Sequence, residues 1–481
     1  MTANAAPPGT SAAADPAAEG FEGRSVRQLA KTHLPLIIGR ATDTREGRRR
    51  SAFAPLDAPG LRDAAEAIRS HTIVNLPDYL ERFADAAEAK GTKVFFAADG
   101  PEAVGYVRDV VRRHGARLIA KGKSMASEEI GLGHSLEADG LRVVETDLGE
   151  YIVQLAGDPP SHITAPAVHL SRGDVARLFT EAHGLDEPLP DEPALLTAFA
   201  RERLREVFLD ADIGICGVNF AVADTGSFAL VTNEGNGRLV TSMPKVVIAI
   251  MGMERIVPSF RELGLMLPML VASASGRAVT TYFSFVNGPR LPEELDGPDE
   301  VHVVVLDNGR SDILNGRYRS ILNCIRCGAC QNVCPVYRHV GGHGYGSVYG
   351  GPIGAVLTPL LVGFDEAGDL PHASSLCGAC SEVCPVKIPL HEHLLELRKD
   401  VAEARAGPAE RAAFRAWSGG WERAWTYRSF ARVARIGQAP FARGRTIRRA
   451  PWPFSRWTRG RDLPAIARRT FRERFADRGE R

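Results

Sequence analysis

Seven of the eight cysteines of this 481-residue chain lie between positions 324 and 384, and this concentration constrains the fold more than any other feature. They form two groups that each end in a Cys-Pro pair, namely Cys324, Cys327, Cys330 and Cys334, then Cys377, Cys380 and Cys384. The first group has the spacing C-x2-C-x2-C-x3-C-P, by which thiolates bind a cubane iron-sulfur cluster. A zinc site or a disulfide framework would not require seven thiols in two such groups. The sequence therefore predicts iron-sulfur clusters.

The ligands of two clusters can be assigned by a rule for two-cluster ferredoxins, in which the last cysteine of each run binds the other cluster. The rule gives Cys324, Cys327, Cys330 and Cys384 to cluster one, and Cys334, Cys377 and Cys380 to cluster two. The second set lacks a ligand, because Ser374 stands three residues before Cys377. We therefore expect [4Fe-4S] at the first site. At the second we expect [3Fe-4S], or [4Fe-4S] with a non-cysteine or open fourth position.

Three side chains near the second cysteine group could supply oxygen or nitrogen to the incomplete site. They are Ser374, Ser375 and His372, although residues of these types are more often ordinary loop residues. The 42 residues between Cys334 and Cys377 are too many for a compact ferredoxin. They include a glycine-rich stretch, 341–354, and then an apolar run, 355–362. We predict a mainly helical two-cluster module over residues 311–400, although a flexible loop between the cysteine groups is the alternative.

Residues 71–310 show alternating strand and helix patterns, which are typical of an α/β domain with a parallel sheet. Expected strands are 93–98, 117–120, 141–145, 213–218, 227–232, 245–251 and 301–306, with helices at 101–114 and 126–136. Polar clusters follow several strands, at 121–124, 145–150, 224–227 and 233–238. Open α/β sheets bind ligands at such strand ends, but each cluster alone is more typical of a turn. The sequence identifies no catalytic residue, no cofactor-binding residue outside the cysteines and no complete P-loop.

The two ends of the chain differ from its centre. Residues 1 to about 25 have a composition typical of disorder, and the rest of 1–70 predicts a helical lead-in. Residues 401–481 contain 20 Arg, no Lys and 7 Asp or Glu, a net charge of +13, against −12 for residues 1–400. No run of about 18 apolar residues and no signal-peptide pattern is present. Since clusters also need reduced thiolates, we expect a cytoplasmic protein.

The basic segment 401–481 also holds all five tryptophans. Trp417, Trp421 and Trp425 recur every four residues, which predicts an aromatic face on a helix that begins near Pro408. Aromatic and Arg side chains favour the centres of protein interfaces, so we expect a docking element for a partner protein. Packing on the cluster module and peripheral contact with an anionic membrane are the alternatives. Nucleic acid is not expected, because no recognition module accompanies the charge.

Several motifs, joined to the cysteine pattern, resemble the lactate-utilisation iron-sulfur protein family (LutB type) over roughly residues 60–400. They are Lys123-Ser124-Met125, 145–150, 160–163, 334–339, 351–354 and 385–391. The resemblance implies an α/β domain akin to the ribose-phosphate isomerase and CoA-transferase fold, a helical ferredoxin module and a family-specific tail. It implies a second cluster held by the three cysteines Cys334, Cys377 and Cys380. It also implies electron transfer during oxidation of L-lactate to pyruvate with two partners, a cysteine-rich subunit and a second α/β protein.

We therefore interpret the chain as the electron-transfer subunit of an L-lactate-oxidising complex, because no flavin or nicotinamide fingerprint is present. The alternative makes the α/β domain the catalytic site of a 2-hydroxy-acid oxidoreductase, with the clusters as internal acceptor. Its base would be Glu145, Asp147 or Glu234. A scaffold with purely structural clusters is a third hypothesis.

Overall fold

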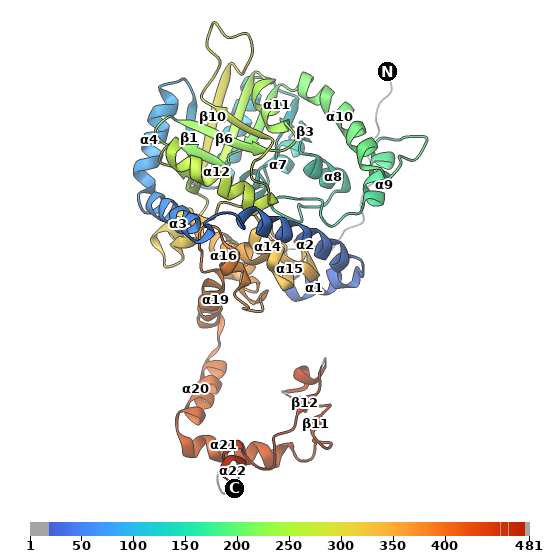
Figure 1. Cartoon of the computed structure of the whole chain (residues 1–481), viewed down its shortest axis with the longest axis vertical. Coiled ribbons are helices and arrows are strands. Elements are labelled where there is room, and N and C mark those ends of the chain that lie inside the picture. The colour runs from blue at the N-terminus through green and yellow to red at the C-terminus, as the bar shows by residue number, and fades with distance from the viewer. Residues whose placement is uncertain (1–18, 453, 460, 477–481) are drawn as a thin grey trace. The chain divides into compact units, whose positions relative to one another are not determined.

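The computed structural model describes residues 19–452, 454–459 and 461–476, which form two compact units (Figure 1). One unit ends at Val401 and the other begins at Ala402. Most of the N-terminal segment expected to be disordered, residues 1–18, lies outside the described residues. The expectation is wrong for the part from Phe21, where helix α1 (Phe21–Ala30) forms. Contacts with the segment around Tyr345 stabilise this helix. Phe21 packs on Tyr345 with ring centroids 5.5 Å apart, and Arg24 donates hydrogen bonds to the carbonyl oxygens of Gly344 and Tyr345.

The first unit is built on a six-stranded parallel sheet with the order β1-β10-β7-β4-β2-β3. The strands are β1 (Lys93–Ala97), β2 (Leu118–Lys121), β3 (Arg142–Glu145), β4 (Ile213–Gly217), β7 (Val246–Gly252) and β10 (Glu300–Leu306). The central strands are buried on both faces, as their near-continuous apolar runs require. The predicted α/β domain and these six predicted strands are confirmed.

Helices cover both faces of this sheet. On one face, α5 (Gly100–Arg113) packs Val104, Val107 and Val111 against the strands, beside α7 (Leu132–Ala138). The single helix predicted over 126–136 is in fact α6 (Met125–Glu129) and α7, because Gly131 takes a left-handed φ of 60° between them. The other face carries α8 (Leu148–Ala156), α9 (Arg172–Ala182), α10 (Pro193–Asp210) and α11 (Asn236–Ser242).

A second sheet of four strands has the order β8-β5-β6-β9. It comprises β5 (Phe220–Val222), β6 (Ser227–Thr232), β8 (Ile256–Val257) and β9 (Tyr282–Val286). The segment 227–232 is a strand as predicted, but it does not belong to the parallel sheet, because it pairs antiparallel with β5 and β9. Helix α12 (Phe260–Ser275) packs on this smaller sheet.

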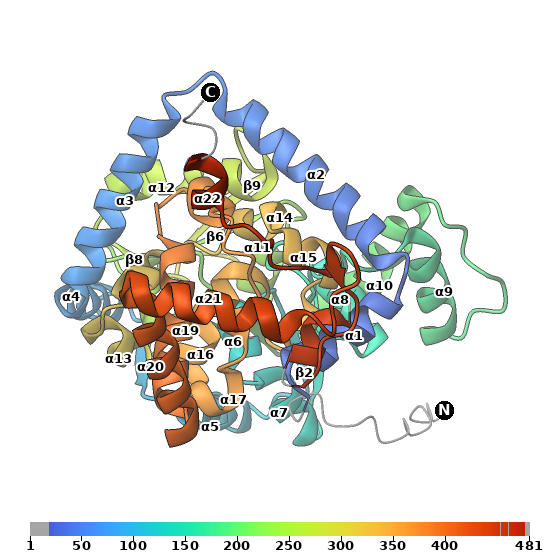
Figure 2. The ribbon, with the colours of Figure 1, turned by 90° about the horizontal axis from the view of Figure 1, so that it is seen from below.

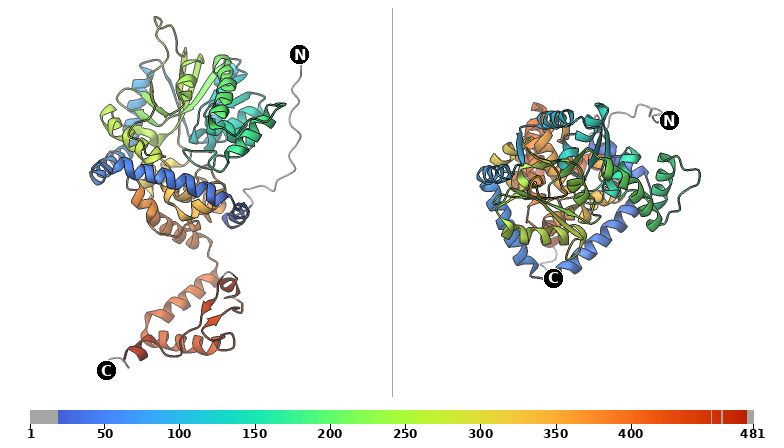
Figure 3. Two further views of the ribbon diagram at one scale, coloured as in Figure 1. Left: turned by 45° about the vertical axis from the view of Figure 1, so that its right-hand side comes forward. Right: turned by 90° about the horizontal axis from the view of Figure 1, so that it is seen from above.

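Two N-terminal helices, α2 (Leu34–Phe53) and α3 (Ala58–Val74), join the α/β domain to the cysteine-rich module. The helix that follows them, α4 (Leu76–Glu88), packs on β1 and β8 of the α/β domain. Helix α2 contacts α12 of the domain as well as α14 and α15 of the module, and α3 contacts both parts in the same way. Figure 2 shows α2 and α3 along two sides of the module, and the left view of Figure 3 shows them between the module and the α/β domain. The helical lead-in therefore fixes one part against the other.

The cysteine-rich module, residues 311–400, is built of short helices and the loops between them, as predicted. Its elements are α13 (Arg310–Asn315), η2 (Arg319–Asn323), α14 (Ala329–Val333), α15 (Pro335–Val340), η3 (His343–Tyr345), α16 (Gly351–Val362), α17 (Phe364–Ala367), η4 (Leu370–His372), α18 (Ala379–Val383) and α19 (Leu390–Arg405). The stretch between the cysteine groups is thus ordered, and α16 is largely buried. A glycine is needed at Gly342, where a Cβ would lie 1.9 Å from the carbonyl oxygen of Ser161 in the α/β domain.

The second unit begins with α20 (Pro408–Glu422) and α21 (Ala424–Gln438). It continues with β11 (Thr446–Ile447), η5 (Phe454–Thr458), β12 (Leu463–Pro464), which pairs antiparallel with β11, and α22 (Phe471–Ala476). The predicted single helix carrying Trp417, Trp421 and Trp425 is wrong, because Arg423 is extended and Trp425 belongs to α21. Gly419 and Gly420 weaken the end of α20, and Gly420 leaves room for Phe430, which would lie 2.9 Å from a Cβ there. Among the described residues, no helix is long and apolar enough to span a membrane.

Candidate iron-sulfur centre and adjoining pocket

The first cysteine group forms a tight loop between η2 and α14. Arg326 has a φ of 58° and Gly328 has a φ of 73°, so the chain is left-handed on both sides of Cys327. This conformation is costly for a side chain such as Arg, and such strain is concentrated at functional sites. Cys330 then lies on α14, and Cys334 begins α15.

The second group repeats this backbone. Leu376 has a φ of 55° and Gly378 has a φ of 82°, on either side of Cys377, and Cys380 lies on α18. Helices α14 and α18 pack against each other, so the two loops lie on neighbouring elements. In the second loop Ser374 takes the position that Cys324 has in the first. Its Oγ accepts the N–H of Leu376 at 3.1 Å, as the Cys324 Sγ accepts the N–H of Arg326 at 3.4 Å.

Four of the cysteines line one small cavity, and they come from both groups. They are Cys324, Cys327, Cys330 and Cys384. The other walls are largely apolar, from Ile163, Ile325, Ile353, Val386, Ile388 and Leu390. Burial raises the pKa of the Cys384 thiol to about 12, and the neighbouring Cys324 contributes to the shift. The structure therefore brings Cys384, from the second group, beside the first three cysteines.

The remaining three cysteines gather separately. Burial raises the pKa of Cys380 to about 11, with Cys334 and then Cys377 as its neighbouring thiols. Burial also raises the pKa of Cys334, and Cys377 adds to that shift. Cys377 is exposed, so this site is closer to solvent than the first. Cys330 also lies near Cys380, as the packing of α14 on α18 requires.

The donor chemistry of both sets fits iron-sulfur clusters. Thiols this deeply buried do not ionise by themselves, so their thiolates need nearby positive charge, which bound iron supplies. Backbone N–H groups point at the sulfurs: Tyr337 donates to Cys334 at 3.5 Å, and Ile388 donates to Cys384 at 3.4 Å. Such donors stabilise thiolates and tune cluster potentials. In the described part of the chain, no three His, Cys, Asp or Glu side chains are arranged to hold a single metal ion.

A buried ionic network connects the first cysteine loop to the α/β domain. Glu254 receives Arg310 Nε at 2.7 Å and Arg326 Nη2 at 3.0 Å, and Arg310 also pairs with Glu129 at 2.7 Å. Burial would raise the pKa of Glu254, but the guanidinium groups of Arg310, Arg326 and Arg255 outweigh it and lower that pKa to about 2. The Arg326 guanidinium lies over the ring of Tyr349, 4.6 Å from its centroid. Removing one side chain of this network would leave a buried charge without its partner, which is strongly destabilising. The ion pair with Glu254 therefore fixes the position of the Arg326 side chain.

His162 and His169 serve packing in this structure. His162 is fully buried against the first cysteine loop, where its Nε2 lies 3.1 Å from Asn332 Oδ1. Burial lowers the pKa of His162 to about 3, so the ring stays neutral. His169 lies 3.2 Å from Asp158. Cys216 is a buried thiol on β4.

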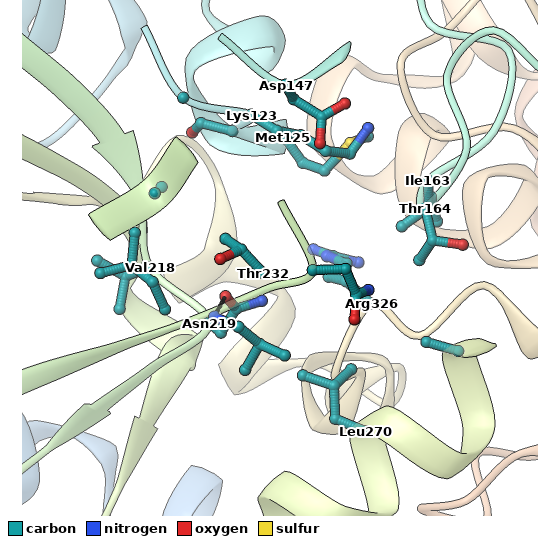
Figure 4. A pocket seen from close by; sticks show the side chains of 18 of the residues that line it. Lys123, Met125, Asp147, Ile163, Thr164, Val218, Asn219, Thr232, Leu270 and Arg326 are labelled. Carbon is teal, nitrogen blue, oxygen red and sulfur yellow. Dashed lines mark hydrogen bonds between the residues drawn. The ribbon is translucent and has the colours of Figure 1, made fainter. Parts of the chain in front are cut away.

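A pocket of about 580 Å³ lies at the carboxyl ends of β2, β4 and β7 (Figure 4). It brings together residues from three of the four polar clusters, including Lys123, Ser124, Asp147, Asn233 and Glu234. The remaining cluster, at 224–227, does not line it. Glu145, one of the proposed bases, does not line it either, because its Oε1 is paired with buried Lys121 at 2.5 Å. Asp147 caps α8, and Glu234 accepts the N–H of Leu148 at 3.0 Å.

Other pocket residues were not expected from the sequence. They are Arg45, Arg48, Arg255, Arg277, Arg310 and Arg326, from α2, η1 (Met253–Arg255), α13 and loops far apart in the chain. For most of these arginines, no motif in the neighbouring sequence indicates a binding site. Arg326 is the exception, since its place inside the C-x2-C run could have drawn attention to it.

Three known families match successive parts of the chain. The LUD domain matches residues 80–306, a 4Fe-4S dicluster domain matches 320–388, and the C-terminal domain of lactate utilisation protein B matches 391–480. The first covers the parallel sheet, and the second covers both cysteine groups.

Curated relatives match over most of the chain. Lactate utilization protein B of Bacillus licheniformis is 52% identical over 420 residues, 87% of this chain and 88% of the relative. Lactate utilization protein B of Bacillus subtilis is 51% identical, with 87% of each chain covered. A solved DUF162 family protein from Deinococcus radiodurans matches 48% of this chain and 98% of its own, at 15% identity and a TM-score of 0.27, which is too low to support an argument about the fold.

Proposed function

Because this chain belongs to the lactate utilization protein B family, we propose that it carries electrons through two iron-sulfur clusters in the oxidation of L-lactate to pyruvate. The observation that carries the proposal is the pair of loops with the same left-handed backbone, which gather seven thiols into two sets. When bound, each cluster would accept and release one electron at a time. The 4Fe-4S dicluster match covers both loops.

We propose that Cys324, Cys327, Cys330 and Cys384 hold the first cluster, and that Cys334, Cys377 and Cys380 hold the second. The shared cavity supports the first set, and the neighbouring thiols of Cys380 support the second. Around these sets the chain excludes water with apolar walls and donates N–H groups to sulfur. Arg62 fixes the second loop by donating to the carbonyl oxygens of Cys384, at 3.0 Å, and Ser381.

Metal analysis of anaerobically prepared protein tests this proposal. We expect roughly eight iron atoms per chain, or roughly seven if the second site holds a three-iron cluster, and little zinc. Paramagnetic resonance of the reduced and oxidised protein should show two components that titrate reversibly. Stoichiometric zinc without iron would contradict the proposal, and clusters that cannot be reduced would support a purely structural role.

For the second cluster we propose that Ser374 stands at the fourth ligand position. Its Oγ makes the same backbone contact as the Cys324 Sγ, whereas Ser375 and His372 are exposed. Arg398 anchors this segment by donating to the carbonyl of Ser374 at 2.7 Å. An alkoxide or a solvent molecule held there would bind iron less firmly than a thiolate.

Replacing Ser374 with Cys should therefore convert the second site into a four-cysteine site. We expect the variant to retain roughly four irons at this site during brief exposure to air, whereas Ser374→Ala should lose one iron and show the signal of a three-iron cluster. Mössbauer and paramagnetic resonance spectra would distinguish the two. Ser375→Cys, on the exposed neighbour, is the matched control and should resemble the parent. Identical second-cluster spectra in all four proteins would exclude Ser374.

Further assignments remain proposals. We infer four segments, 1–70, 71–310, 311–400 and 401–481, with an α/β domain related to ribose-phosphate isomerase and CoA-transferase folds. We also infer a cytoplasmic protein with two partners, a cysteine-rich subunit and a second α/β protein. The family match over 391–480 supports a dedicated role for the tail, which we propose is to bind one of them.

A further inference from the structure

The pocket at the strand ends carries an excess of positive charge. Seven of its lining residues are Arg or Lys, and three are Asp or Glu. Some of this charge is balanced, because Arg310 lies between Glu129 and Glu254, and Lys123 pairs with Glu150 at 2.5 Å. Among the described residues, Arg45, Arg48, Arg255 and Arg277 form no ion pair with a carboxylate. Within the part of the chain that the structure describes, Arg45 and Arg255 have only neutral oxygens as hydrogen-bond partners, and the carboxylates that line the pocket are fewer than its cations, so the pocket keeps a net positive charge.

These cations are arranged by depth. Arg48 and Arg277 are exposed at the rim, whereas Arg45 is half-buried and donates to Thr164 Oγ1 at 3.2 Å and to the Ala274 carbonyl at 3.4 Å. Burial lowers the pKa of Arg45, and no carboxylate opposes that shift. Holding a guanidinium in this position is unfavourable unless an anion joins it.

Arg326 is buried and has an unused donor. Its Nη2 pairs with Glu254, but its Nη1 is buried without a hydrogen-bond partner. The residue lines both the large pocket and the small cavity formed by the first-cluster cysteines. It is also the residue that immediately precedes Cys327 in the binding loop. A ligand in the pocket and a cluster in the cavity would therefore both lie beside Arg326.

Neutral polar groups complete the pocket, among them Thr164, Asn219 and Thr232. Figure 4 shows Asn219 and Thr232 on one side of the pocket, apart from Lys123 and Asp147, which lie together on another. Hydroxyl and amide groups of this kind suit a ligand that has hydroxyl or carbonyl oxygen besides its charge. The volume is within the range of pockets for small molecules.

We propose that this pocket binds a small oxyanion, a carboxylate or a phosphate, and that Arg326 couples its binding to the redox state of the first cluster. An anion near Arg326 makes the addition of an electron to the cluster less favourable. By reciprocity, reduction of the cluster weakens binding of the anion. The coupling rests on the proposed cluster, whereas the binding itself does not.

Binding can be measured by calorimetry on the anaerobic, iron-loaded full-length protein at low ionic strength. Inorganic phosphate and L-lactate are the two probes, and chloride is the reference anion. We expect saturable binding of at least one probe, and which of them binds identifies phosphate or carboxylate chemistry. The double variant Arg48→Gln, Arg277→Gln should weaken binding tenfold or more, whereas Arg201→Gln, an exposed position outside the pocket, should not change it. Absence of saturable binding, or equal affinity in the double variant, would overturn the proposal.

Coupling can be measured by redox titration of the first-cluster resonance with and without the bound probe. A tenfold difference in affinity between oxidised and reduced protein corresponds to about 59 mV for a one-electron couple. We expect the probe to lower the midpoint potential in the parent and to lose this effect in the Arg48/Arg277 double variant, which leaves the cysteine loop untouched. A midpoint potential that is independent of the probe would overturn the coupling. Protein without iron would contradict the proposed function instead, while calorimetry would still decide the binding.

Discussion

Cys384→Ser should remove the first cluster and leave the second, although Cys384 belongs to the second cysteine group in the sequence. The reason is geometric: Cys384 shares a cavity with Cys324, Cys327 and Cys330, and the second set does not line it. We expect iron to fall from roughly eight to roughly four atoms per chain, with loss of the resonance assigned to the more buried cluster. Metal analysis of the anaerobic protein measures the iron content, and paramagnetic resonance measures the loss of the resonance.

Cys380→Ser is the matched variant, because Cys380 also lies in the second group but neighbours Cys334 and Cys377. It should spare the component that Cys384→Ser removes. If both variants lose the same component, the exchange of ligands between the two groups is wrong. Because metal binding and local folding are coupled, circular dichroism should accompany the spectra to show that each variant is folded.

The two cysteine loops were predictable because the thiols of each group are local in sequence. A thiolate loop encodes its geometry in a few consecutive residues, so spacing alone indicated two groups and the missing ligand at Ser374. The parallel sheet was predictable for a similar reason, since each buried strand is a continuous apolar run. The strand at 227–232 shows what such a run cannot predict, namely the sheet to which a strand belongs. Its residues predict a strand, but its pairing with β5 and β9 depends on segments that are distant in sequence.

The charged pocket could be predicted only in part. The polar clusters after the strands indicated residues such as Lys123 and Glu234, because the carboxyl ends of parallel strands lie at one edge. Arg45 and Arg277 come from α2 and from the loop after α12, and nothing near either residue signals a site. Arginines on helices usually belong to solvated faces, so only tertiary packing could distinguish them.

The second unit presents an unusual amount of aromatic surface. Phe414, Trp417, Trp421 and Trp425 each expose between 58% and 64% of their surface, and Trp452 exposes 87%. Trp421 contacts Trp417 and Tyr427 at centroid distances of 5.7 and 5.2 Å, which makes the rings one cluster on α20 and α21. Exposed aromatic clusters rimmed by arginine are typical of protein interfaces. An electron carrier must also bind an electron donor and an electron acceptor, and we expect the aromatic cluster on α20 and α21 to contact one of these proteins.

Deleting residues 408–481 should therefore leave both clusters intact but abolish lactate-dependent reduction in the presence of the partner proteins. The cut keeps α19 whole, so the contact of Tyr318 with Asp400 survives. Co-purification with the partners and the rate of cluster reduction are the measurements, and we expect both to fall to background.

Two full-length variants distinguish whether the aromatic or the basic side chains of the second unit bind the partner. Replacing Phe414, Trp417, Trp421 and Trp425 with Ser should reproduce the deletion if the aromatic surface binds a partner. Replacing Arg432, Arg435, Arg448 and Arg449 with Gln should instead weaken binding mainly at low ionic strength, where unscreened charge steers association, and should change it little at high ionic strength. Normal assembly of the truncated protein would exclude docking through the tail. Loss of its clusters would show that the tail supports the cluster module. Retained assembly combined with loss of binding to anionic vesicles would assign the aromatic surface to a membrane, because Arg-rich helices with apolar faces also lie on lipid headgroups.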